Sequence, residues 1–168
     1  MAAGSTYTPI ATTTLSSTAT SVTFSSLGSY TDIIAIITAS AASPDDIRFR
    51  FNGDTGSNYS WTTLYGTGSA AGSFRQSSTS SGAADYYGSP STVSGATIQT
   101  IHFMNYANST TYKTAIARGN RSDSGADSTV SLWRNTSAIT SIQFGIGTSF
   151  SNTIAVGSTF TLYGIAAA

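Results

Sequence analysis

The chain has 168 residues, no cysteine and a formal net charge of zero. The length suits one domain with its own core, and the missing cysteine excludes disulfide bonds, thiolate metal sites and thiol nucleophiles. Only 8% of the residues are charged, against about a quarter in an ordinary soluble protein. Such a composition suits a protein that packs against neighbours, although a surface made polar by hydroxyl groups explains it equally well.

Apolar residues recur at every second position in successive segments, which is the period of a half-buried strand. In chain order the alternation covers residues 21–25, 47–51, 59–65, 130–132, 142–146 and 160–162. Segment 33–37 is apolar at nearly every position instead. That pattern predicts a central strand that is covered on both faces.

Helical periodicity is almost absent, and turn-forming residues separate the predicted strands. Asn52, Gly53 and Asp54, for example, are most simply explained as the turn of a β-hairpin. We therefore expect an all-β protein, an antiparallel β-sandwich of about eight strands, with a jelly roll as the favoured topology. An up-and-down barrel is the alternative.

Two segments are expected to depart from the sandwich, which we place at residues 16–168 as a single domain. Residues 1–15 predict an extended N-terminal arm that lies across a neighbouring subunit. Residues 66–95 are rich in Gly and Ser and predict a long loop. Its Phe74, Arg75, Tyr86 and Tyr87 belong to residue types that are enriched at protein interfaces, or else they fold back onto the sandwich.

Arg48 and Arg50 share one face of a predicted strand whose other face is apolar. They are suited to bind acidic groups of a neighbour, or to protect an edge strand from uncontrolled pairing. The full set of candidate interface residues is Tyr7, Pro9, Ile10, Arg48, Arg50, Phe74, Arg75, Tyr86 and Tyr87.

Catalytic and ligand-binding signatures are weak. His102 is the single histidine and lies among apolar residues, and the chain has no Gly-x-Ser-x-Gly motif. Glutamate is absent and the aspartates lie in turn-like contexts, so a glycosidase pair or a calcium loop is not indicated. The arginines are scattered, and no apolar run could span a membrane. We expect no catalytic residue, cofactor, metal, nucleic acid or membrane partner.

Several stretches, in order along the chain, resemble small bacteriophage virion proteins of the jelly-roll type. The stretches are residues 7–15, 22–26, 30–32, 49–54 and 58–60, then Trp133 with 138–142, and the closing alternation at 157–165. The resemblance implies a structural virion protein, most simply a capsid decoration or cement protein on the virion surface. It would form a homotrimer and contact the major capsid protein. A tail-fibre or receptor-binding module that contacts host glycans is the alternative.

Overall fold

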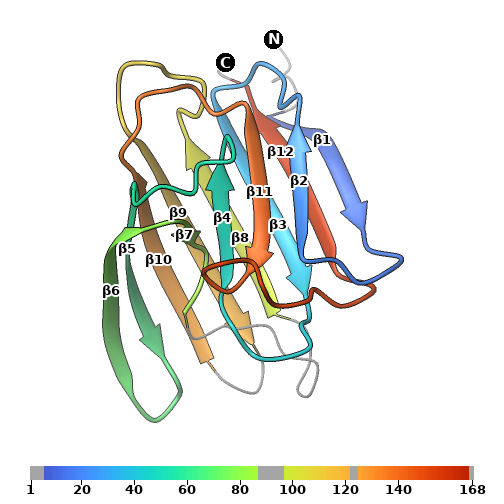
Figure 1. The fold of residues 1–168 in the computed structure, drawn as a ribbon, viewed down its shortest axis with the longest axis vertical. Helices are drawn as coiled ribbons and strands as arrows, with labels where there is room; N and C mark the ends of the chain where they lie inside the picture. The colour runs from blue at the N-terminus through green and yellow to red at the C-terminus, as the bar shows by residue number, and fades with distance from the viewer. Residues whose placement is uncertain (1–5, 87–96, 122–124, 167–168) are drawn as a thin grey trace.

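The computed structural model describes residues 6–86, 97–121 and 125–166, which form twelve strands in two antiparallel sheets (Figure 1). None of these residues lies in a helix. The larger sheet contains, in spatial order, β1 (Tyr7–Thr14), β12 (Thr159–Ile165), β3 (Asp32–Ala39), β8 (Thr97–Met104), β9 (Lys113–Arg121), β10 (Gly125–Trp133), β5 (Tyr59–Gly66) and β6 (Ala71–Thr79). The smaller sheet contains β2 (Ser21–Ser25), β11 (Ser141–Ile146), β4 (Ile47–Phe51) and β7 (Gly82–Ala83).

The strand order confirms the antiparallel sandwich. Strands β1-β12-β3-β8 lie opposite β2-β11-β4-β7, and this order of eight strands is that of a jelly roll. Two hairpins, β5–β6 and β9–β10, extend the larger sheet beyond β8. They explain why the described chain has twelve strands where the sequence predicted about eight.

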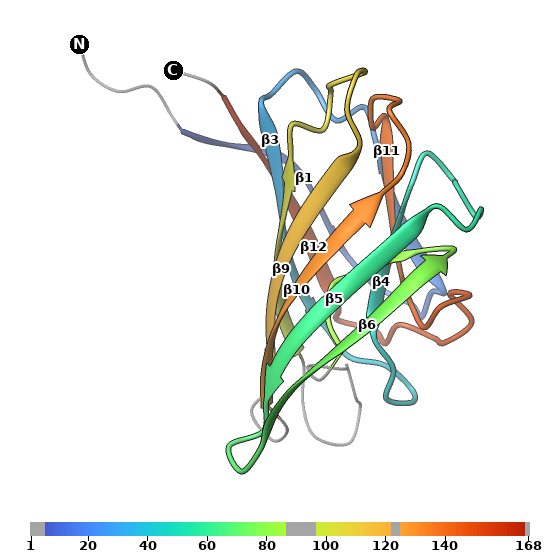
Figure 2. The same ribbon diagram turned by 90° about the vertical axis from the view of Figure 1, so that its left-hand side faces the viewer.

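The extension gives the larger sheet its shape. Figure 2 shows that β5 and β6 are inclined to β3 and β9 and reach toward the side on which β4 and β11 lie. This inclination follows from the twist that each added strand contributes to a sheet. The two added hairpins therefore curve around one side of the jelly roll.

The core lies between the sheets and is rich in aromatic rings. Phe49 and Phe51 of β4 meet Phe103 of β8 edge-to-face, with centroids 5.2 and 5.4 Å apart. Phe51 also contacts the ring of Trp133 at 5.3 Å. The alternation in 47–51 correctly predicted which β4 side chains point inward, because Ile47, Phe49 and Phe51 are all buried.

Three sequence-based expectations about segments are wrong. Residues 7–14 do not form a separate arm, because β1 pairs with β12 along its whole length, from Tyr7 opposite Ile165 to Thr14 opposite Thr159. The predicted loop 66–95 contains β6 and β7, and its part from 87 to 95 lies outside the described residues. No hairpin forms around Asn52, since β4 and β5 belong to different sheets.

Candidate functional site

The outer face of the larger sheet, which is the face turned away from the smaller sheet, carries exposed aliphatic side chains. Five adjacent strands, β3, β8, β9, β10 and β5, each contribute at least one of them. The exposed fractions are 41% for Ile36, 50% for Ile98, 41% for Ile116, 48% for Val130 and 64% for Leu64. Side chains of this kind are usually replaced by polar ones where an antiparallel sheet faces water.

Strand register joins the outer-face side chains into rows. Ile34 lies opposite His102, His102 opposite Ile116, and Ile116 opposite Val130. Directly opposed residues on one face of a sheet are in side-chain contact range. An open hollow of about 450 Å³ accompanies this row, and it is lined by Tyr7, Ile34, Thr100, His102, Ile116, Arg118 and Ile165.

The prediction that segment 33–37 is covered on both faces is therefore wrong. Ile33, Ala35 and Ile37 are buried in the core, but Ile34 is only half-buried and Ile36 is exposed. An apolar run of this kind is typical of a strand with two covering layers, whereas the described residues place a layer on only one face of β3. The extra isoleucines of β3 belong to the outer face.

Charged and imidazole groups on strands β3 to β5 of the outer face are few. His102 Nε2 lies 2.7 Å from Asp32 Oδ2, and Asp32 Oδ1 accepts a hydrogen bond from the Asn105 backbone N–H at 2.7 Å. Arg118 is exposed near the middle of the face. The face thus combines hydroxyls and aliphatic groups with one acidic, one basic and one imidazole side chain on strands β3 to β5.

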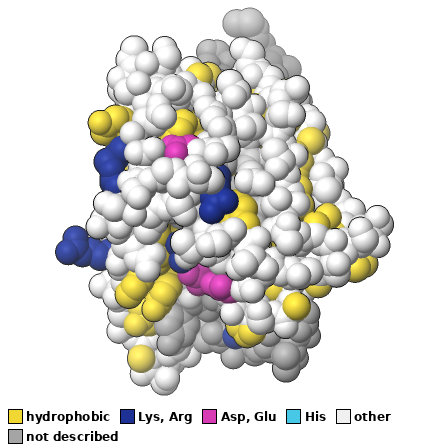
Figure 3. All heavy atoms as spheres, in the orientation of Figure 1, with side chains coloured by type: hydrophobic (Ala, Val, Ile, Leu, Met, Phe, Trp, Pro, Cys, Tyr) yellow, Lys and Arg dark blue, Asp and Glu magenta, His cyan; other side chains and the backbone are white. Residues whose placement is uncertain are grey.

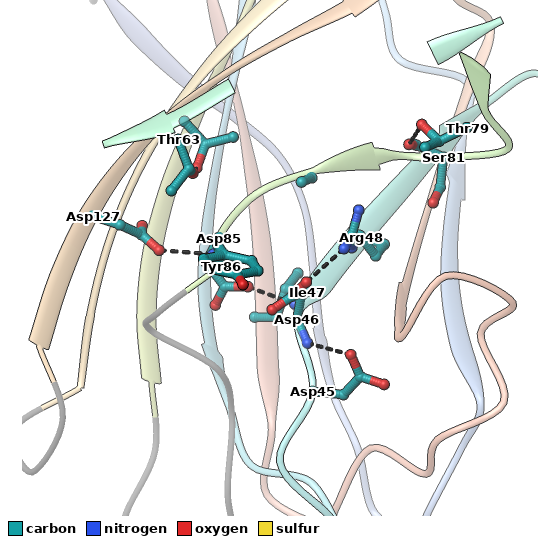
Figure 4. A network of polar contacts seen from close by, with 12 residues as sticks. Asp45, Asp46, Ile47, Arg48, Thr63, Thr79, Ser81, Asp85, Tyr86 and Asp127 are labelled. Carbon is teal, nitrogen blue, oxygen red and sulfur yellow. Dashed lines mark hydrogen bonds and ion pairs between the residues drawn. The ribbon is translucent and has the colours of Figure 1, made fainter. Parts of the chain in front are cut away.

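A buried polar network forms a second candidate site, between β4, β7 and the inner face of β10 (Figure 4). Arg48 donates to Asp46 at 2.5 Å, and both are almost completely buried. Asp85 follows β7 and accepts hydrogen bonds from the Ile47 backbone N–H at 2.8 Å and from Gln99 Nε2 at 2.7 Å. Asp127 accepts one from the Tyr86 backbone N–H at 2.7 Å.

Asp85 is the most perturbed group of this network. Burial raises the pKa of its carboxyl well above the usual value, and the carboxylates of Asp46 and Asp127 raise it further. Gly119 makes room for its partner Gln99, because a side chain at Gly119 would begin 2.1 Å from the Gln99 amide. The surroundings of Asp85 therefore keep its carboxyl group neutral over a wider pH range than usual.

Aromatic rings lie next to the network. Phe74 and Tyr86 stack with centroids 4.5 Å apart and planes 6° from parallel, and Trp61 lies 5.6 Å from Phe74. Arg48 Cζ lies 4.5 Å from the centroid of the Trp61 ring. Three predicted interface residues, Arg48, Phe74 and Tyr86, are thus brought together, although only Phe74 is substantially exposed, at 36%.

The remaining predicted interface residues lie elsewhere. Arg50 shares the face of β4 with Arg48, as predicted, but it packs on the ring of Phe150 at 4.1 Å and donates to the carbonyls of Ser80 and Thr148. Because β4 lies between β11 and β7, neither arginine protects an edge strand. The arginine contacts are made within the chain rather than offered to a neighbour.

The other positions are divided between the edge and the outer side of the large sheet. Arg75 lines a groove of about 280 Å³ next to β5 and β10. Tyr7 and Pro9 are exposed on the edge strand β1, whereas Ile10 packs against the core. Tyr87 lies outside the described residues.

Sequence reasoning missed both the outer-face isoleucines and the buried aspartates. The isoleucines did leave a signal, since an apolar run can mean two buried faces or one buried and one interacting face. Asp85 and Asp127 left none, because their burial depends on strands that are distant in sequence. Among the residues described, no three His, Cys, Asp or Glu side chains are placed to hold a metal, and no helix is long and apolar enough to cross a membrane.

Comparison with known proteins adds no assignment: no protein-family model matches the chain, and no curated protein matches it.

Proposed function

We propose that the protein is a structural component of a bacteriophage particle and acts as a capsid decoration, or cement, protein. The observation that carries the proposal is the aliphatic outer face, to which five adjacent strands contribute exposed side chains. Large exposed apolar patches on soluble proteins usually mark interaction sites. The resemblance of the stretches between residues 7 and 165 to small virion proteins supplies the biological setting.

The proposed mechanism is mechanical. The protein, as a homotrimer, binds the major capsid protein on the virion surface and bridges neighbouring capsomers through non-covalent contacts. Each contact buries apolar area and adds a modest free energy, and many copies per particle make the sum large. Neither catalysis nor a cofactor, a nucleic acid or a membrane takes part.

The copy number of the chain in purified particles tests this proposal. Quantitative mass spectrometry should give a ratio to the major capsid protein near one. A tail protein measured in the same sample serves as the low-copy reference. Absence of the chain from washed particles would rule out any virion role.

A tail module that binds host glycans is the second candidate, and the cluster of Trp61, Phe74 and Tyr86 favours it. Aromatic rings beside polar groups are typical of small-molecule and sugar sites, and Phe74 is partly exposed. For a tail module, the copy number of the chain should be a few per cent of the copy number of the shell protein. Phe74→Ala would then reduce host-cell binding, while Tyr112→Ala, at an exposed loop position, would leave it unchanged.

A further inference from the structure

We propose that the outer face of the larger sheet is a self-association surface, on which a second copy of this chain packs its own outer face. The inference deepens the proposed function, on which it rests for its biological setting, by naming the partner of that face. It makes the face a contact between copies and leaves other surfaces to the shell protein. Its support comes from the area, the charge and the side-chain chemistry of the face.

The face has the area that a stable pairing needs. Strands β12, β3, β8, β9, β10 and β5 are neighbours, and each has seven to nine residues. At a spacing of about 4.8 Å and a rise of about 3.4 Å per residue, they present roughly 29 by 27 Å, or about 800 Å². A stable protein interface buries about 800 Å² on each partner.

The face carries few charges. On strands β3 to β5 its outward charged side chains are Asp32 and Arg118, which have opposite signs, and Arg75 and Arg134 line the groove beside Val130 and Leu132. The whole chain has a formal net charge of zero, so two copies do not repel each other at long range.

The side chains are those of a sheet that packs against another sheet. Ile36, Ile98 and Ile116 are β-branched, exposed and separated by small hydroxyl residues such as Thr100. In β-sandwiches, side chains of this kind from two facing sheets interdigitate across about 10 Å. The row through Ile34, His102, Ile116 and Val130 would form the centre of such a layer.

The pairing has a predictable symmetry. When the same patch is used by both copies, the contact is isologous and closes after two. It therefore produces a dimer when it acts alone, or a pair of trimers when the proposed homotrimer forms through other surfaces. Assemblies with an even number of copies are the signature.

Sedimentation equilibrium of the purified chain tests the inference. The unmodified protein should associate into an even-numbered assembly, and Ile116→Lys should raise the dissociation constant at least about tenfold, because a charge would be buried at the centre of the contact. Val156→Lys is the matched control, since Val156 is 58% exposed in the turn between β11 and β12, away from the face. Its dissociation constant should not change.

Separate measurements test whether the variant is folded and which partner binds the outer face. Circular dichroism verifies that Ile116→Lys is folded, and Val130→Lys, at a 48% exposed position on the next strand, repeats the test if it is not. A chain that is monomeric at all concentrations overturns the inference, whether or not Ile116→Lys also abolishes particle binding. If the chain is monomeric and Ile116→Lys abolishes particle binding, the outer face binds the shell protein instead of a second copy. A chain that pairs through this face but is absent from particles supports the inference and refutes the proposed function.

Discussion

Two aspartates show how the same residue type takes opposite roles in this protein. Asp85 is completely buried, and the desolvation and neighbouring carboxylates that raise its pKa make its charged form unfavourable. Burial also tends to raise the pKa of Asp54, but hydrogen bonds from Trp133, Asn58 and Gly56 together lower it below the usual value. Folding therefore disfavours the charged form of Asp85 and favours the charged form of Asp54.

Asp85→Asn should stabilise the protein at neutral pH, because the amide carries no charge whose burial opposes folding. The amide oxygen keeps an acceptor for the Ile47 N–H, and the amide nitrogen faces Gln99 Nε2 until the Gln99 amide turns over. The turned Gln99 then accepts through Oε1, which has no hydrogen-bonding partner among the described residues. Because the folded-state pKa of Asp85 is raised, its contribution is most favourable below the unfolded value of 3.8 and is lost as pH rises through the folded value. The variant should lack this loss.

Chemical denaturation between about pH 2 and pH 8 measures the effect. Asp54→Asn is the matched control with the opposite sign, because the lowered pKa of Asp54 contributes stability above 3.8 that is lost as pH falls through the folded value. If Asp85→Asn loses stability at neutral pH, the charged carboxylate is needed and the account of the network is wrong.

At the scale of elements, close approaches between strands and loops depend on missing side chains. Gly164 lies in β12, and the ring of Tyr30, in the loop before β3, lies directly against it. The hydroxyl of Tyr106 accepts a hydrogen bond from the Tyr30 backbone N–H and donates to the Gly28 carbonyl. The ring and the loop together cover one end of the sandwich.

Gly164→Ala should destabilise the protein by about 1 to 3 kcal/mol, because the added methyl would lie 2.3 Å from the Tyr30 ring. Urea denaturation of the variant measures this cost. The same substitution in a Tyr30→Ala background should cost much less, since the ring that the methyl displaces is gone. Equal costs in the two backgrounds would mean that the contact is not the cause.

For the whole molecule, the scarcity of charge is the governing feature. Figure 3 shows a face on which a few acidic and basic groups and some hydrophobic patches are set among mostly uncharged polar side chains and backbone. Such a surface neither repels nor attracts strongly at long range. Contacts with other proteins must then come from apolar burial and short-range hydrogen bonds.

Self-association should accordingly depend little on salt. Between about 0.1 and 1 M sodium chloride the screening length falls from about 10 to 3 Å, yet the dissociation constant should change by less than about threefold. Sedimentation equilibrium across this range measures it, with Arg118→Gln as the control for a charge on the face. A large weakening by salt would point to ion pairs instead of the isoleucine layer.

Much of the fold could be predicted from alternation alone. The inward side chains of β2, β4, β11 and β12 are those that the period-two pattern marked, with Phe24, Phe49, Phe144 and Phe160 as examples. In β10 the period was right but the face was wrong: Val130 is exposed, whereas Asp127, Thr129 and Ser131 are buried. The inner face of β10 meets the polar network and the backbone of Ala83, so it is lined by polar groups.

The sequence by itself determined that this chain forms strands with two distinct faces, because alternation is a property of neighbouring residues. Only the tertiary structure decided which face is covered, since that depends on which distant strand lies opposite. Tertiary structure therefore placed Asp85 in the interior, drew the segment 71–83 into two sheets, and left the isoleucines of β3 facing outward. Both proposals rest on the outer face of the larger sheet. That face is exposed because none of the described residues forms a layer over it.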